Sequence, residues 1–140
     1  MRIEIQNSKS INLINDVIHD QWFNIHDIKL DDLNEIITIK FNYEDRINSR
    51  IIYKFLILKK VKIPIRKYYL KINNVKLVEL DDTEKVELYD FNAINFQEEE
   101  SRIKITTGIP LRFELVVDKF KISIEDSDDS IKWKEKIVWF

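Results

Sequence analysis

The 140-residue chain predicts a mostly β fold, α+β at the margin: an antiparallel β-sandwich or partly open barrel with one N-terminal amphipathic helix. Apolar and polar residues alternate over most of the chain, one early segment has apolar residues every three or four positions, and turn-forming clusters separate these segments. The length is typical of a single compact domain over residues 1–140, and it is enough to bury a core without disulfide or metal support.

The first elements expected are a short strand over residues 2–6 and a helix over residues 10–21. Ser8 or Ser10 offers a hydroxyl to cap the free amides at the start of the helix. The apolar stripe consists of Ile11, Ile14, Val17, Ile18 and Trp22, and the opposite side carries Asn12, Asn15, Asp16 and His19. We therefore expect the first set to dock on a sheet and the second set to face solvent.

Strands are expected wherever apolar and polar residues alternate, namely over residues 37–43, 61–66, 102–106 and 119–125. Residues 51–58 are apolar on both sides except at Lys54, which predicts a strand in the centre of the sheet. Pro64 has no amide hydrogen to donate, so an edge or a bulge is expected nearby. The terminal sequence IKWKEKIVWF, which ends in Phe140, fits either a helix or a strand. Its aromatic residues should dock on this domain or, alternatively, join two copies in a homodimer.

Charge is segregated along the chain although the net charge is only −2. Residues 46–78 contain ten basic residues and no acidic one, whereas residues 79–100 contain nine acidic residues and one lysine. The candidate partner-binding residues lie in the basic segment: Lys59, Lys60, Lys62, Arg66, Lys67, Tyr68 and Tyr69. Such a surface suits an acidic protein partner. The alternative is structural, because a basic strand beside the following acidic strand would form favourable cross-strand pairs. The overall negative charge disfavours nucleic acid.

Two His-Asp dipeptides, at His19 and His26, are the only weak candidates for a metal site. Their seven-residue spacing fits neither one face of a helix nor one face of a strand, so we expect no metal and no other cofactor. His19 is better explained as a residue that closes the helix, where a cation suits the helix dipole.

The composition excludes several function classes. With one glycine and no cysteine, the chain has no glycine-rich phosphate loop and no cysteine-ligated zinc site. No serine lies in a recognisable nucleophile context, so an enzyme is not expected. We expect a cytoplasmic, non-catalytic interaction module, for instance a bacterial immunity-type or regulatory protein, with no membrane span or membrane partner. The alternative is a β-barrel that carries a small apolar ligand.

Overall fold

A computed structural model of the chain describes residues 1–139. Its one α-helix, α1 (Ile11–Ile18), follows a short first strand. The strands are β1 (Ile3–Ile5), β2 (Trp22–Asp31), β3 (Ile36–Glu44), β4 (Arg50–Phe55), β5 (Leu58–Ile72), β6 (Val75–Asp81), β7 (Leu88–Gln97), β8 (Arg102–Thr107), β9 (Arg112–Val117), β10 (Ile122–Asp126) and β11 (Lys132–Trp139). Short 3₁₀ turns are η1 (Ser8–Ser10), η2 (Arg46–Asn48) and η3 (Glu98–Glu100).

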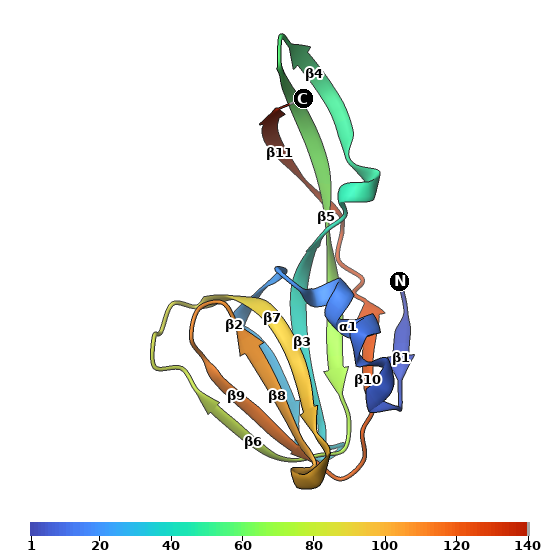
Figure 1. The fold of residues 1–140 in the computed structure, drawn as a ribbon, viewed down its shortest axis with the longest axis vertical. Helices are drawn as coiled ribbons and strands as arrows, with labels where there is room; N and C mark the ends of the chain where they lie inside the picture. The colour runs from blue at the N-terminus through green and yellow to red at the C-terminus, as the bar shows by residue number, and fades with distance from the viewer. Residues whose placement is uncertain (140) are drawn as a thin grey trace.

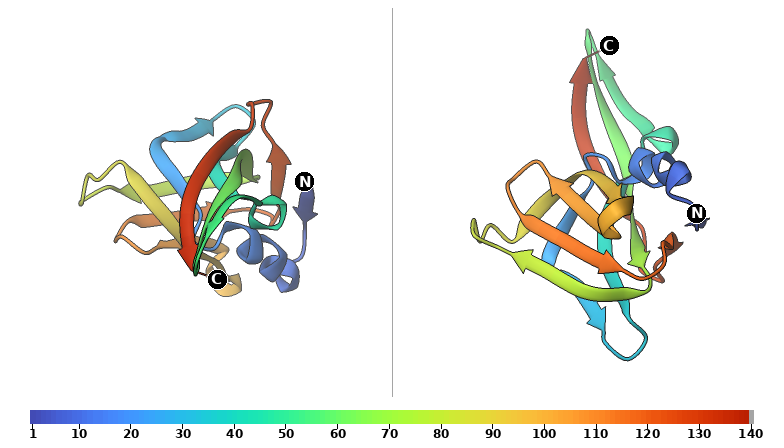
Figure 2. Two further views of the ribbon diagram at one scale, coloured as in Figure 1. Left: turned by 90° about the horizontal axis from the view of Figure 1, so that it is seen from above. Right: turned by 60° about the horizontal axis from the view of Figure 1, so that its bottom comes forward.

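The strands form one antiparallel sheet in the order β1-β10-β5-β3-β2-β7-β8-β9-β6, and β4 and β11 pair with β5 off this path. Figures 1 and 2 show that the sheet is strongly curled, with α1 lying against it. The prediction of a mostly antiparallel β fold with one N-terminal helix is confirmed. The helix is shorter than predicted: it ends at Ile18, and Trp22 begins β2.

Helix α1 lies between the two sides of the curled sheet. It contacts β7 on one side and β1 and β10 on the other, and its Ile14 and Ile18 are completely buried. The predicted serine cap is wrong. Ser10 makes no side-chain capping bond, and Asn7 instead accepts a hydrogen bond from the Lys9 amide to cap η1.

Asn15 is partly buried rather than facing solvent as predicted, and His19 is exposed as predicted, but the side chains of both bond to β7. The Asn15 amide accepts from the Ile94 N–H at 2.7 Å and donates to the Ile94 carbonyl at 3.1 Å. The His19 ring Nδ1 lies 2.9 Å from the Asn92 carbonyl oxygen. Strand β2 pairs with β7 only through residue 90, so Asn15 supplies the bonds that a neighbouring strand would otherwise make.

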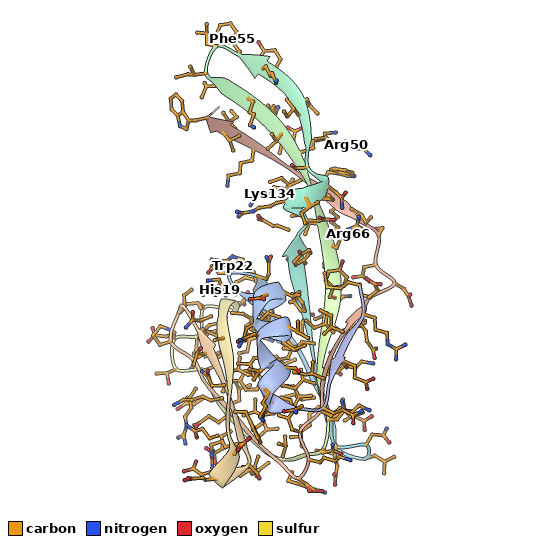
Figure 3. The ribbon with its side chains drawn as sticks, turned by 45° about the vertical axis from the view of Figure 1, so that its right-hand side comes forward. His19, Trp22, Arg50, Phe55, Arg66 and Lys134 are labelled. Carbon is orange, nitrogen blue, oxygen red and sulfur yellow. The ribbon has the colours of Figure 1, made fainter. Side chains whose placement is uncertain are left out.

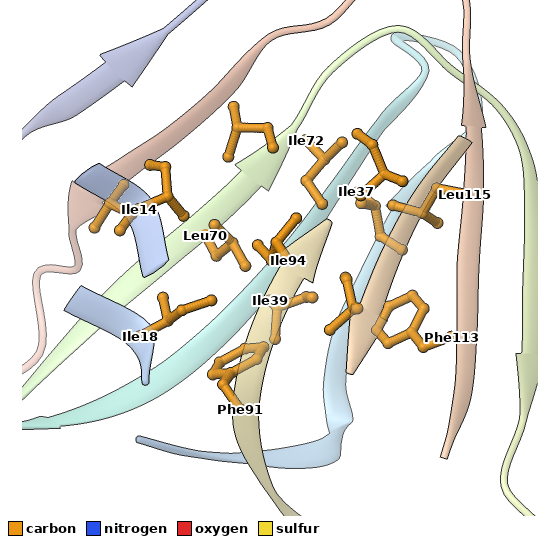
Figure 4. Packing of buried hydrophobic residues seen from close by; sticks show 14 of the residues in the cluster. Ile14, Ile18, Ile37, Ile39, Leu70, Ile72, Phe91, Ile94, Phe113 and Leu115 are labelled. Carbon is orange, nitrogen blue, oxygen red and sulfur yellow. The ribbon is translucent and has the colours of Figure 1, made fainter. Parts of the chain in front are cut away.

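The core fills the inside of the curled sheet. Figure 4 shows Ile14 and Ile18 of α1 close to strand residues such as Leu70, Ile94 and Phe91. The Phe91 ring stacks on the Phe23 ring, with 4.5 Å between the ring centroids, and meets the Phe41 ring edge-on, with 5.7 Å between the centroids. We refer to this part of the protein, the curled sheet with α1, as the body.

Strand β5 has 15 residues and belongs to two parts of the fold. Its second half pairs with β3 and β10 inside the body, whereas its first half pairs with β4 and β11 alone. Figure 1 shows β4, β11 and this half of β5 projecting from the body as a three-stranded arm. We define the arm as residues 50–65 and 132–139.

The arm overturns the prediction of a central strand over residues 51–58. That segment is a hairpin: β4 ends at Phe55, Leu56 takes a left-handed conformation (φ 54°), and β5 begins at Leu58. The apolar residues on both of its sides are therefore largely exposed rather than buried. The ambiguous C-terminal segment is a strand, β11, and Phe140 lies outside the described residues.

Candidate interaction surface on the protruding arm

The arm has two faces, which follow from its strand register. Residues directly opposite each other in an antiparallel pair share a face, and successive residues alternate between faces. Because Tyr53 and Ile137 both pair with Lys60, and Phe55 and Trp139 both pair with Leu58, these residues share one face. This inner face continues the side of β5 that carries the buried Tyr68 and Leu70 into the core.

The inner face of the arm is largely apolar towards its tip, where Lys60 lies among aromatic and aliphatic residues, and nothing covers it in the part of the chain that the structure describes. The exposed fractions are 60% for Tyr53, 57% for Phe55, 67% for Ile137 and 70% for Trp139. Three of these residues, Tyr53, Phe55 and Ile137, line a shallow hollow of about 530 Å³ together with Ile52, Leu58, Lys59 and Lys60. At the tip of the hairpin, Leu56 is 82% exposed. Contiguous exposure on this scale is typical of a surface that binds another molecule.

The opposite, outer face of the arm carries lysines. Its β11 positions are Lys132, Lys134, Lys136 and Val138, and its β4 and β5 positions include Lys54 and Lys59. Lys134 binds Glu44 of the body, but Lys132 and Lys136 form no ion pair with any described residue. The outer face is therefore basic along β11, and Val61 and Ile63 of β5 lie buried on the same face.

The arm as a whole carries eight basic residues against one acidic residue, a net charge of +7. The acidic residue is Glu135, whose carboxylate lies 2.9 Å from the Lys60 ammonium. That ion pair holds the pKa of Glu135 below its usual range. Since the whole chain carries −2, the rest of the protein is strongly acidic.

Ion pairs at the base of the arm fix it to the body. Asp45 accepts hydrogen bonds from Asn48 Nδ2 at 2.7 Å and from Arg66 Nε at 3.0 Å. These bonds, first that of Asn48, hold the pKa of the buried Asp45 below its usual value. Glu44 pairs with Lys134 at 2.9 Å and its pKa is lowered chiefly by that bond. In Figure 3, Arg66 and Lys134 lie on either side of this junction.

A proline also marks the junction. On one edge of β5, pairing passes from Glu44 of β3 to Arg50 of β4, and on the other it passes from β10 to β11. Pro64 lies at the first of these changes, between Ile65, which pairs with Glu44, and Lys62, which pairs with Arg50, and its carbonyl accepts a hydrogen bond from the Asp45 amide. A residue without an amide hydrogen fits a strand position where the ladder is interrupted.

The seven candidate partner-binding residues do not share one face. Lys60 and Lys62 lie on the inner face of the arm, and Lys59 lies on the outer face. Tyr68 is buried in the core, and Arg66 is held by Asp45. Lys67 and Tyr69 lie on the outside of the body, where the Lys40 ammonium lies 5.8 Å from the centre of the Tyr69 ring.

The expectation that the basic strand pairs with the following acidic strand is wrong. Strands β5 and β6 are consecutive, but β6 pairs with β9, and its Glu79 binds Arg102 and Arg112 there. The acidic partners of β5 come from other segments. Besides Asp45 and Glu135, Glu125 of β10 binds Lys71 at 2.8 Å. Much of the basic segment is thus neutralised, but by residues distant in sequence.

The two histidines lie in different settings. His19 caps α1 and its Nε2 lies 3.4 Å from Asp20, whereas His26 is an exposed residue of β2. No group of three or more His, Cys, Asp or Glu side chains within residues 1–139 is arranged to hold a metal ion. No helix within these residues is long and apolar enough to cross a bilayer.

The sequence reasoning missed the contribution of β11 to this surface. Lys132, Lys134 and Lys136 lie about 70 residues along the chain from the β5 residues that they pair with, and only this pairing joins them to the basic segment. The available signal was the alternation in KWKEKIVW, which favours a strand with three lysines on one side and, apart from Glu135, aromatic or aliphatic residues on the other.

Comparisons with known proteins give no further constraint on this surface. No protein-family model matches the chain, and neither a curated protein nor a solved structure matches it.

Proposed function

We propose that this protein is a non-catalytic interaction module whose arm binds an acidic protein partner. One observation carries the proposal: a projecting structure with a net charge of +7 and an uncovered apolar face, on a chain whose net charge is −2. Uncovered aromatic residues supply the contact area that dominates binding energy, and the surrounding charge selects the partner and speeds association.

The surface in this proposal differs from the basic segment of the sequence: it leaves out two of the candidate residues and adds the lysines of β11. Lys59, Lys60 and Lys62 remain in it, with Lys67 and Tyr69 at its margin on the body. Arg66 and Tyr68 serve the fold instead, since one binds Asp45 and the other is buried. The lysines of β11 join the surface through their pairing with β5.

The biological setting that we propose is a cytoplasmic immunity-type or regulatory protein of a bacterium. Such proteins act by stable binding, so that a rigid, preformed and strongly charged surface suits them. The ion pairs of Asp45 and Glu44 at the base of the arm support that rigidity.

The proposal is tested by partner capture with a charge-reversed arm. The variant Lys62→Glu/Lys132→Glu/Lys136→Glu changes three arm lysines for which no ion pair is found among the described residues. A matched control, Lys9→Glu/Lys29→Glu/Lys119→Glu, changes the net charge equally on exposed parts of the body. Each bait is incubated with lysate of the source cells, and bound proteins are quantified by mass spectrometry.

We expect an acidic protein to be enriched by the wild type and by the control, and to be lost with the arm variant. Circular dichroism melting of both variants checks that they fold. Equal capture by all three folded baits contradicts the proposal, and so does the absence of any protein that the wild type enriches over the arm variant.

A further inference from the structure

Strand β11 is an open edge of the arm. Within residues 1–139 it pairs with β5 alone, over an unbroken register from Lys132 to Trp139. The other outer strand, β4, has an irregularity between Ile51 and Tyr53 that interrupts its ladder. A bulge protects an edge against further pairing, whereas a regular edge strand leaves a row of amides and carbonyls ready to bind an additional strand.

We infer that the acidic partner binds by adding an extended segment to the edge of β11, a segment in which acidic and apolar residues alternate. This inference rests on the proposed function and specifies how the partner is recognised. In such β-augmentation the main chain provides hydrogen bonds, and alternate side chains provide specificity.

The two faces of β11 determine the alternation. Side chains of the added strand on the inner face would lie beside Trp133, Ile137 and Trp139, which favours apolar residues, while Glu135 on this face is already paired with Lys60. Those on the outer face would lie beside Lys132, Lys134 and Lys136, which favours aspartate or glutamate.

The same lysines disfavour a second copy of this chain as the occupant. If two β11 strands paired edge to edge with their apolar faces matched, the outer face would carry the lysines of both copies side by side. Like charges opposite each other in a sheet are destabilising, and edge lysines are a common device against self-association. An acidic strand turns that repulsion into attraction.

The test uses the intact protein and fluorescent synthetic peptides. The first peptide alternates Glu and Val, and the second has the same composition with the Val residues at one end and the Glu residues at the other. Binding is measured by fluorescence anisotropy, and hydrogen–deuterium exchange follows the amides of residues 132–139. The variant Lys132→Glu/Lys136→Glu is compared with the body control Lys9→Glu/Lys29→Glu.

We expect the alternating peptide to bind about tenfold more tightly than the segregated one, because only the alternating peptide can place all its Val residues on the inner face and all its Glu residues on the outer face. The β11 variant should lose about tenfold or more of this affinity, and the body control should keep it. Amides of β11 should exchange more slowly in the complex, since their outward N–H groups gain partners.

Two results separate the inference from the proposed function. If both acidic peptides bind equally, or if binding leaves exchange in β11 unchanged, strand addition is overturned while an acidic-partner surface on the arm stands. If neither peptide binds, strand addition is overturned. If the charge-reversed arm variant also captures the same proteins as the wild type, the proposed function is overturned as well.

Discussion

The body and the arm share strand β5, but apolar residues on the inner side of this sheet are buried in the body and largely exposed in the arm. In the body, the inner side of β5 places Leu70 and Ile72 completely out of solvent, under α1 and the other side of the curled sheet. In the arm, the same side of the strand continues to Leu58, opposite Phe55 and Trp139, which are more than half exposed. The alternation is the same, but only the body has a second layer.

The charges of the two regions differ as well. Basic and acidic residues are interspersed in the body, where Arg112, for example, lies 2.7 Å from Glu79 and 3.0 Å from Glu114. The arm has a single acidic residue. The body thus buries its apolar residues and intersperses its charges, whereas the arm exposes apolar area and carries a net charge of +7. An acidic partner would cover that apolar area and offset that charge.

The largest expected effect separates core from arm. Phe91→Ala should lower the free energy of unfolding by about 3–5 kcal/mol, because it removes a completely buried ring that packs on Phe23 and Phe41. Phe55→Ala, a change of the same chemistry in the arm, should change it by less than about 0.5 kcal/mol. Urea denaturation measures both. Similar losses in the two variants would show that the arm is part of the cooperative core.

The next effect concerns the bond between α1 and β7. Asn15→Ala should destabilise the body by about 1–3 kcal/mol, since the amide and carbonyl of Ile94 lose their partner. Asn12→Ala on the exposed side of the same helix is the control and should have little effect. Thermal melting of both variants measures the difference, and equal melting temperatures would refute this account of Asn15.

A smaller effect is expected at the base of the arm. Arg66→Met should cost about 1–2 kcal/mol, because it leaves the Asp45 carboxylate without one of its donors. Hydrogen exchange should report the loosening in residues 58–65 before it appears in the body strands. Uniform acceleration across the whole sheet would indicate that Arg66 stabilises the body rather than the junction.

Acid should weaken the same junction. Asp45 and Glu44 have lowered pKa values in the folded protein, so their contribution is fully present above the ordinary carboxyl pKa values and is lost as the pH falls through the lower folded-state values. The window lies below about pH 4. Exchange or limited proteolysis at descending pH should therefore open the arm first in the wild type. In Arg66→Met the change should be shallower, and an unchanged profile would contradict the assignment to Asp45.

The smallest effect on stability is expected for an exposed apolar residue of the arm, where loss of binding and loss of stability should separate. Ile137→Ser in the arm should leave the free energy of unfolding within about 0.5 kcal/mol of the wild type, because this side chain is two-thirds exposed. It should nevertheless weaken partner capture, since it removes part of the apolar inner face. A variant that is destabilised but still binds would reverse the roles assigned to the two regions.

Much of the fold could be predicted from the sequence because its signals are local. Alternation at residues 37–43 and 102–106 identified β3 and β8, and the stripe of Ile14 and Ile18 identified α1. The prediction failed at residues 51–58, where residues apolar on both sides usually indicate a buried strand. Here they form a hairpin that nothing else in the described chain covers.

The candidate surface was only partly predictable. The basic segment supplied Lys59, Lys60 and Lys62, but alternation along β5 turns Tyr68 into the core, and Asp45 binds Arg66. Which acidic residue neutralises which lysine depends on strand order. Because β6 pairs with β9 rather than with β5, adjacency in the sequence gave the wrong partner.

The period of the alternating strands, the amphipathic helix and the segregation of charge can be derived from the sequence alone, since each depends on the order of neighbouring residues. Only the tertiary structure decided that residues 50–65 and 132–139 form one projecting arm. Strand pairing is a non-local event, and it is this pairing that joins two lysine-rich segments into a single surface of charge +7. Burial is likewise a property of the layers and not of the strand, so one long β5 serves as core at one end and as an open surface at the other.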